Sequence, residues 1–273
     1  MQKLHIVEWF QSFTRPVIIA HRGASAYFPE NTLPAIEAAI EYGSDMVEVD
    51  IRMTADGVPV ISHDSNLQRT ANRKENIADL TWKQLQQVDV GSWFHSRYDE
   101  LRVLSLRQFL EVCEGQIPAN LEIKFHFRES PKLKDALKMV MEELAYFKME
   151  DQVVISGFNR NISAIVKSLK PEVASAVLHN PLQWKRVLPS RVVKNYNADF
   201  FHCSWRQFGK SWQQDLQKHH IPINVYTVNQ TVTYMRMREL GVCGVFTDRP
   251  DMLLKLEKSL QKPHRSNSAL SES

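Results

Sequence analysis

Short apolar runs alternate with amphipathic stretches along most of this chain. The run at 17–20, Val-Ile-Ile-Ala, is continuous, as expected for a strand buried on both faces of a parallel sheet. Later apolar runs are separated by stretches in which hydrophobic residues recur every three or four positions, which is the spacing of a helix. Strands are therefore predicted at 17–20, 46–51, 120–124, 152–156, 173–178, 199–202, 223–228 and 244–247. Helices are predicted at 131–147, 159–169, 181–195, 210–219, 231–240 and 250–260.

This regular alternation predicts parallel strands that are joined by right-handed crossovers. Eight strands close such an arrangement into a (β/α)8 TIM barrel, and 273 residues suit one domain of this α/β class, which typically takes about 250. We expect an N-terminal helix within 1–15, the barrel over 16–260, and a disordered tail over 261–273, whose composition cannot bury enough apolar surface to order it.

The stretch from 66 to about 117 interrupts the alternation. It contains polar turns and two short predicted helices, at 82–88 and 106–113, and it follows a short strand at 58–62. We expect a small insertion between the second and third barrel strands, because the segment is too poor in apolar residues for a core of its own. Trp93 and Phe94 are interpreted as packing the insertion onto the barrel, with a wall of the substrate site as the alternative.

Composition excludes several classes of protein. Hydrophobic residues make up 43% of the chain, enough for a sizeable core, so general disorder is not expected. The 34 Lys and Arg nearly balance the 31 Asp and Glu, which gives no reason to expect nucleic-acid binding. The N-terminal residues lack the pattern of a signal peptide, and no apolar run reaches the ~18 residues of a membrane span. Three widely spaced cysteines are typical of reduced core thiols, and a cytoplasmic, soluble protein is predicted.

Polar residues concentrate where the first predicted strands end. In a (β/α)8 barrel the active site lies at the carboxyl ends of the strands, so these residues are expected to share one site. They are His21 and Arg22 after the first strand, Glu48 and Asp50 in the second, His63 after the 58–62 strand, and Glu122 and Lys124 at the end of the third.

Three of these residues are carboxylates with a geometry that suits a metal ion. Glu48 and Asp50 are two positions apart on one strand, so both point to the same face, and Glu122 ends the next barrel strand. Three converging carboxylates would repel one another unless a cation lay between them. Oxygen ligands favour Mg²⁺ or Ca²⁺. The alternatives are a solvated strand end or simple pairing of Glu122 with Lys124.

The two histidines and the arginine suit chemistry on a phosphate ester. The pKa of free histidine lies close to neutral pH, so His21 and His63 could share general acid and base work. Arg22 offers a planar fork that matches phosphate oxygens, and its alternative role is an ion pair with one of the acids. The remaining histidines are interpreted as surface or core residues, and His126, just past Lys124, is the first of them to check.

At this point the sequence resembles the glycerophosphodiester phosphodiesterase family. The resemblance runs in family order from about residue 16 to residue 256, and the combination of motifs is more specific than any one of them. The motifs are His21-Arg22-Gly23, Pro29-Glu30-Asn31-Thr32, Glu48-Val49-Asp50, Asp56-Gly57, His63-Asp64, Leu121-Glu122-Ile123-Lys124, Thr227-Val228-Asn229 and Thr247-Asp248-Arg249-Pro250.

The resemblance implies a TIM barrel that hydrolyses glycerophosphodiesters to sn-glycerol 3-phosphate and an alcohol. It implies that His21 and His63 are the catalytic acid and base, that Glu48, Asp50 and Glu122 bind a divalent metal, Mg²⁺ or Ca²⁺, and that Arg22, Lys124, Asn31, Phe158 and Tyr226 serve substrate binding. Asn31 could also cap the following helix, as could Thr32.

The chain departs from the family pattern at some positions. Tyr226 stands where many relatives have Trp, and Phe125 and His126 follow Lys124 where proline or small residues are frequent. Leu104-Ser105-Leu106 replaces the usual Pro-Thr-Leu. These changes could reshape the pocket for the alcohol group of the substrate. Two other functions stay open: a lysophospholipase D acting on lipids, and a catalytically silent barrel that binds phosphodiesters or a partner protein.

Overall fold

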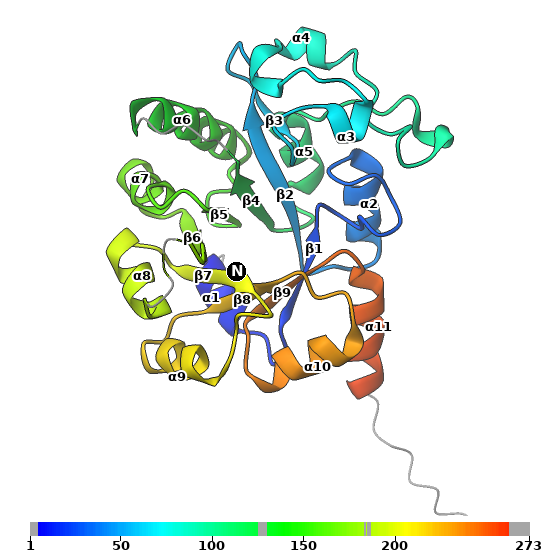
Figure 1. Ribbon diagram of the computed structural model, residues 1–273. Coiled ribbons are helices and arrows are strands. Elements are labelled where there is room, and N and C mark those ends of the chain that lie inside the picture. The colour runs from blue at the N-terminus through cyan, green and yellow to red at the C-terminus, as the bar shows by residue number, and fades with distance from the viewer. Residues whose placement is uncertain (1–4, 125–129, 183, 185–186, 262–273) are drawn as a thin grey trace, which may run out of the picture.

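The structure is a closed barrel of parallel strands surrounded by helices (Figure 1). It is a computed structural model that describes residues 5–124, 130–182, 184 and 187–261, without the side chains of residues 130 and 131. Neighbouring barrel strands pair in parallel, and β1 pairs with both β2 and β9, which closes the barrel. The barrel strands are β1 (Val17–His21), β2 (Met46–Met53), β4 (Ala119–Ile123), β5 (Val153–Gly157), β6 (Ala174–Leu178), β7 (Phe200–Ser204), β8 (Ile223–Tyr226) and β9 (Gly244–Thr247). The predicted eight-stranded TIM barrel is therefore confirmed.

One helix follows each barrel strand and packs on the outside of the barrel. The helices are α2 (Leu33–Glu41), α5 (Leu106–Cys113), α6 (Ser130–Phe147), α7 (Ile162–Leu169), α8 (Pro189–Tyr196), α9 (Lys210–Lys218), α10 (Thr231–Glu239) and α11 (Pro250–Gln261). The prediction of a helix from 181 was wrong at its start. Leu188 is extended because it precedes Pro189, which fits the first turn of a helix, so α8 begins there.

The N-terminal helix is α1 (Ile6–Gln11), and it covers the end of the barrel at which the strands begin. Ile6 and Phe10 are buried in a cluster with residues of β1, β7 and β9. The ring of Phe10 meets that of Phe200 with 4.9 Å between centroids. The helix thus seals the barrel floor.

The predicted insertion follows β3 (Pro59–Ile61), which pairs antiparallel with β2. It continues through α3 (Gln68–Ala71), the 3₁₀ turn η1 (Ile77–Asp79), α4 (Trp82–Leu85) and η2 (Ser96–Tyr98), and α3 and α4 lie outside the ring of helices (Figure 1). Its apolar side chains form a small cluster of their own. Helix α5 instead packs on the barrel core through Phe109 and Leu110. The limits of the insertion, 66 to about 117, stay a prediction.

The alternation along β2 separates the core from the site. Val47, Val49 and Ile51 face outward into the packing between strands and helices, so Glu48 and Asp50 face the barrel interior.

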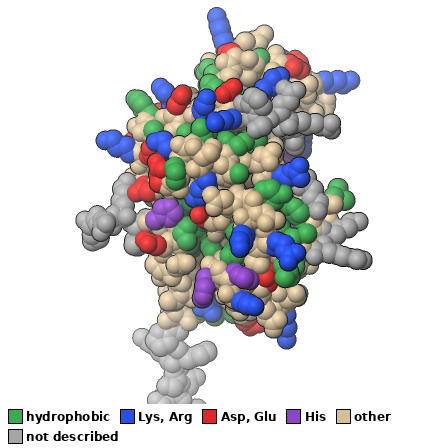
Figure 2. Space-filling view, turned by 90° about the vertical axis from the view of Figure 1, so that its left-hand side faces the viewer, with side chains coloured by type: hydrophobic (Ala, Val, Ile, Leu, Met, Phe, Trp, Pro, Cys, Tyr) green, Lys and Arg blue, Asp and Glu red, His purple; other side chains and the backbone are tan. Residues whose placement is uncertain are grey.

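The cysteines Cys113, Cys203 and Cys243 are free thiols. Among the described residues no helix combines the length and apolar character that a membrane crossing needs. Basic and acidic side chains are interspersed on the face in Figure 2.

Candidate active site

The predicted site residues meet at the carboxyl ends of the barrel strands, around a cavity of about 200 Å³. Of the ten predicted residues, only Asp50 and Asn31 do not line it. The cavity is lined by His21, Arg22, Glu48, His63, Glu122, Lys124, Phe158 and Tyr226, with Asn120, Ser156, Leu178, His202, Thr227 and Phe246. The wall is therefore partly aromatic and partly charged, which suits a small polar molecule with an organic part.

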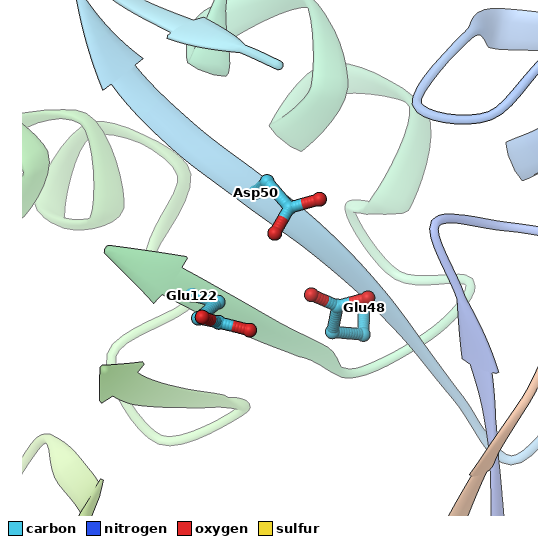
Figure 3. Close-up of side chains that lie close together, drawn as sticks. All are labelled: Glu48, Asp50 and Glu122. Atoms are coloured by element: carbon cyan, nitrogen blue, oxygen red, sulfur yellow. The ribbon is translucent and has the colours of Figure 1, made fainter. Parts of the chain in front are cut away.

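The three carboxylates form one cluster. Asp50 of β2 lies beside Glu122 of β4 in the strand register, and Glu48 is two residues earlier on the same face. One oxygen of each lies within 4.8 Å of the others, and the three side chains point toward one another (Figure 3). Glu48 Oε2 accepts a hydrogen bond of 3.0 Å from the Arg22 backbone N–H, whereas its buried Oε1 has no hydrogen-bond partner among the described residues.

Burial and neighbouring charges shift the pKa values of the three carboxyl groups in different directions. Burial and the negative charge of Asp50 raise the pKa of Glu48 to about 8. Burial also raises the pKa of Glu122, against the opposing charge of Lys124. For Asp50 the effect of burial is outweighed by the charges of Lys124 and Arg22, and its pKa falls to about 2. A divalent cation would let all three acids ionise. Buried oxygen donors with one unpartnered atom fit a hard ion such as Mg²⁺ or Ca²⁺.

His21 is held by a carboxylate from the far end of the chain. Its Nδ1 lies 2.6 Å from Asp248 Oδ1, and its Nε2 faces Glu48 Oε2 at 4.0 Å. Asn229 fixes Asp248 in turn, since its Nδ2 donates to Asp248 Oδ2 at 2.5 Å and its Oδ1 accepts from the Asp248 backbone N–H at 2.9 Å. Burial lowers the pKa of His21, but the hydrogen bond with Asp248 and the charge of Glu48 outweigh it, so the pKa is raised.

His63 is anchored in the same way, by a carboxylate at Nδ1. Its Nδ1 lies 2.8 Å from Asp64 Oδ1, and its backbone carbonyl accepts from Arg52 Nε at 2.9 Å. Its pKa is lowered, chiefly by burial, with the charges of Arg22 and Lys124 acting in the same direction against that of Asp50. No described residue hydrogen-bonds Nε2 of either His21 or His63. Each ring is therefore anchored through Nδ1 and can use Nε2 for chemistry.

The two cations are paired with acids of the site. Arg22, with a left-handed backbone (φ 57°), places Nη1 2.9 Å from Glu30 Oε1 and Nε 3.2 Å from Asp50 Oδ2. Lys124 Nζ lies 3.2 Å from Asp50 Oδ1 and 2.5 Å from Glu122 Oε1. The alternative ion-pair roles of both residues are thus present. Both also line the cavity, so pairing does not remove them from a bound anion.

Asn31 acts on Asp50 rather than on the cavity. Its Nδ2 donates to Asp50 Oδ2 at 2.9 Å, and its Oδ1 accepts from the Asp50 backbone N–H at 3.3 Å. Both ends of the buried amide thus contact Asp50, and the role of Asn31 in substrate binding stays a prediction. It does not cap α2: Thr32 is at the cap position, and its hydroxyl donates to the carbonyl of Pro29.

Several residues that the structure places at the site were not assigned a role from the sequence. Asp248 and Asn229 belong to quoted motifs, and the signal that could have identified Asp248 is its position after β9, the strand that pairs with β1. His202, interpreted as surface or core, is buried and lines the cavity, and burial lowers its pKa to about 3, so it is neutral. His126 lies outside the described residues.

Comparison with known proteins agrees with this geometry. The glycerophosphoryl diester phosphodiesterase family matches residues 21–252. A glycerophosphodiester phosphodiesterase of Bacillus altitudinis is 30% identical over 255 residues, which cover 89% of this chain and 99% of that protein. The structure of an Oleispira antarctica phosphodiesterase in complex with the product sn-glycerol-3-phosphate has a TM-score of 0.80 and 26% identity, and the match covers 91% of this chain and 98% of that one. A glycerophosphodiester phosphodiesterase from Agrobacterium tumefaciens has the same fold, with a TM-score of 0.75, 24% identity, and 88% and 99% of the two chains covered. The chain therefore belongs to the glycerophosphoryl diester phosphodiesterase family and is an enzyme of that class.

Proposed function

We propose that this enzyme hydrolyses soluble glycerophosphodiesters, such as glycerophosphocholine or glycerophosphoethanolamine, to sn-glycerol 3-phosphate and an alcohol. The observation that carries the proposal is the pair of histidines, each anchored to a carboxylate through Nδ1, beside a three-carboxylate cluster in one cavity. The Oleispira relative, whose structure holds sn-glycerol-3-phosphate, supports this choice of product. A cytoplasmic location stays a prediction.

Glu48, Asp50 and Glu122 would hold the divalent metal, Mg²⁺ or Ca²⁺. When bound, such an ion supplies Lewis acidity that polarises a phosphoryl oxygen and offsets its charge. The residues present fit this ion, because their donors are all carboxylate oxygens, are buried, and lie within 4.8 Å of one another.

The side chains around the cluster transfer protons, orient the two histidines, offset charge and contact the substrate. One histidine takes the proton of the attacking hydroxyl or water at its Nε2, and the other donates a proton from its Nε2 to the departing alkoxide. Asp248 and Asp64 keep the two rings oriented and fix which nitrogen is available. Arg22 and Lys124 offset the negative charge that grows on the phosphoryl oxygens. Phe158 and Tyr226 would pack against the organic part of the substrate.

The function is tested by incubating the purified protein with glycerophosphocholine, glycerophosphoethanolamine and a lysophospholipid, each with Mg²⁺ and with Ca²⁺. We expect release of sn-glycerol 3-phosphate from the two soluble diesters, measured with an enzyme-coupled assay. Turnover of the lysophospholipid gives an acylated glycerol phosphate and the free alcohol, so it is followed by release of the alcohol, and a faster rate than with the soluble diesters would favour the lipid-directed function instead. Absence of turnover with every diester and metal would favour a silent binding barrel.

Asp248 provides a test of how His21 is held. We expect Asp248→Asn to lower kcat by about 10- to 100-fold with little change in KM, because an amide can present N–H to Nδ1 and thereby reverse the tautomer of the ring. Steady-state kinetics on glycerophosphocholine measure the effect. Asp251→Asn is the matched control, since Asp251 lies three residues further along the chain, pairs with Lys255 and does not contact His21. An Asp248→Asn enzyme with wild-type kcat would contradict the assignment.

A further inference from the structure

We propose that Arg69, which the insertion contributes, is a positioning residue that orients both His63 and Arg22. This inference rests on the proposed function, because it concerns the same site. Arg69 lies on α3, outside the ring of barrel helices, and it does not line the catalytic cavity. Its guanidinium nevertheless contacts two carboxylates that each hold a residue of the site.

The guanidinium of Arg69 joins Glu30 and Asp64. Its Nη1 and Nη2 donate to Glu30 Oε2 and Oε1 at 2.9 and 2.7 Å, which is a bidentate pair. Its Nε donates to Asp64 Oδ2 at 2.7 Å. Three donors of one planar fork are thus used on two acids, an arrangement that a lysine ammonium could not reproduce in the same way.

Each of these two carboxylates also contacts a residue of the site. Asp64 uses its other oxygen, Oδ1, to hold His63 Nδ1 at 2.8 Å. Glu30 Oε1 also accepts from Arg22 Nη1 at 2.9 Å, and Arg22 Nε in turn reaches Asp50 Oδ2 at 3.2 Å. Without Arg69, Asp64 would lose its counter-charge and could turn away from His63. Glu30 would keep only Arg22 as a partner and could draw it away from Asp50.

The charge state of Glu30 agrees with this network. Burial raises its pKa, but the hydrogen bond from Arg69 and the charges of Arg22 and Arg69 outweigh burial, so the pKa is lowered and Glu30 is ionised. Trp93 of the insertion supports the guanidinium, which lies 5.5 Å from the centre of its ring. The indole N–H of Trp93 donates to the carbonyl of Val90 at 2.9 Å, which fixes the ring. The insertion thus gives Arg69 a defined position.

A purely structural role is the alternative. The side chain of Arg69 is 42% exposed, so solvent screening weakens its contribution to folding stability, while the bidentate geometry keeps part of that contribution. Small errors in the placement of a reacting group, by contrast, can lower turnover strongly. Arg69 should therefore affect kcat more than it affects unfolding.

Arg73 provides a matched control from the same insertion. Its side chain is 41% exposed and pairs with Glu75 by two hydrogen bonds, of 3.1 and 2.5 Å, away from the site. We would measure kcat and KM on glycerophosphocholine, and thermal unfolding, for wild type, Arg69→Ala, Arg69→Lys and Arg73→Ala. We expect Arg69→Ala to lower kcat about tenfold with KM nearly unchanged, while Arg73→Ala keeps wild-type kinetics and both alanine variants unfold at similar temperatures.

Two further variants make the test specific: Arg69→Lys, and Arg69→Ala combined with Asp64→Asn. Arg69→Lys should recover only part of kcat, because one ammonium cannot bridge two carboxylates as the fork does. In an Asp64→Asn background, Arg69→Ala should cost less than it does alone, because the path to His63 is already broken. Wild-type kcat in Arg69→Ala or in Arg69→Lys would overturn the inference, as would a raised KM with unchanged kcat. Inactivity of the wild type on all glycerophosphodiesters would instead refute the proposed function.

Discussion

We expect His21→Ala and His63→Ala each to lower kcat on glycerophosphocholine by about 100- to 10,000-fold, the range associated with losing a positioned proton donor or acceptor. The reason is geometric. Each ring is anchored at Nδ1, at 2.6 Å to Asp248 and at 2.8 Å to Asp64, and has its Nε2 free of described hydrogen-bond partners. Both rings line the cavity that contains Glu48 and Glu122. KM should change much less than kcat, because neither ring is needed to attract the anionic phosphodiester group of the substrate.

The leaving group can show which histidine is the acid. A p-nitrophenolate departs without needing a proton, so the variant that lacks the general acid should regain activity on a p-nitrophenyl diester of glycerol 3-phosphate. The variant that lacks the base should stay impaired on both substrates. His219→Ala is the control, because this side chain is 50% exposed and does not line the cavity. If His21→Ala and His63→Ala both kept most of the wild-type kcat, the assignment of the acid and base pair would be wrong.

The parts of the site that could be predicted are those that depend on short segments. Glu48 and Asp50 stand two residues apart within the predicted strand at 46–51, and the period of a strand sends both to one face whatever the rest of the chain does. The carboxyl ends of neighbouring parallel strands meet, so Glu122 could be placed with them from its position at the end of the next barrel strand. The barrel itself could be predicted for the same reason, from repeated local patterns.

The parts that could not be predicted depend on contacts across the chain. Asp248 is 227 residues from His21, and their contact exists only because β9 closes on β1. Arg69 and Glu30 meet because the insertion folds back over the start of α2, and no periodic pattern in either segment encodes that approach. Asn31 was ambiguous locally, since an asparagine before a helix suits a cap. Only the tertiary structure, with φ of 59° at Asn31, shows that its side chain hydrogen-bonds Asp50 instead of capping the helix.

We expect removal of divalent metal with EDTA to abolish turnover, and Glu48→Gln to remove the ability of added Mg²⁺ or Ca²⁺ to restore it. Glu48 is the informative ligand because its Oε1 is buried without a described partner, while Oε2 accepts from the Arg22 backbone. A glutamine can keep that backbone contact and the shape of the side chain, but it puts an amide N–H where a metal needs an oxygen. The metal site is lost while the local fold is kept.

Thermal unfolding separates metal binding from catalysis. A cation at 100 times its Kd should stabilise the wild type by about 2.7 kcal/mol, whereas Glu48→Gln should show little stabilisation. Glu75→Gln, which changes an exposed acid of the insertion, should respond like the wild type. Equal stabilisation of wild type and Glu48→Gln by the metal would show that the ion binds elsewhere.

When no metal is present, Glu48→Gln should be more stable than the wild type, which is the reverse of the order expected with metal. The pKa of Glu48 is raised from 4.5 to about 8 in the folded protein, so in EDTA the wild type loses stability as pH rises from about 4.5 to about 8, where the folded state resists ionisation and the unfolded state does not. Glu48→Gln carries no such group. Its advantage in unfolding temperature over the wild type should therefore grow with pH across this window and should vanish when metal is added. A constant difference at all pH values would mean that Glu48 is not held protonated. The opposite responses to EDTA and to metal have one cause. Burial and mutual repulsion disfavour ionisation of all three acids, and a bound cation offsets both effects.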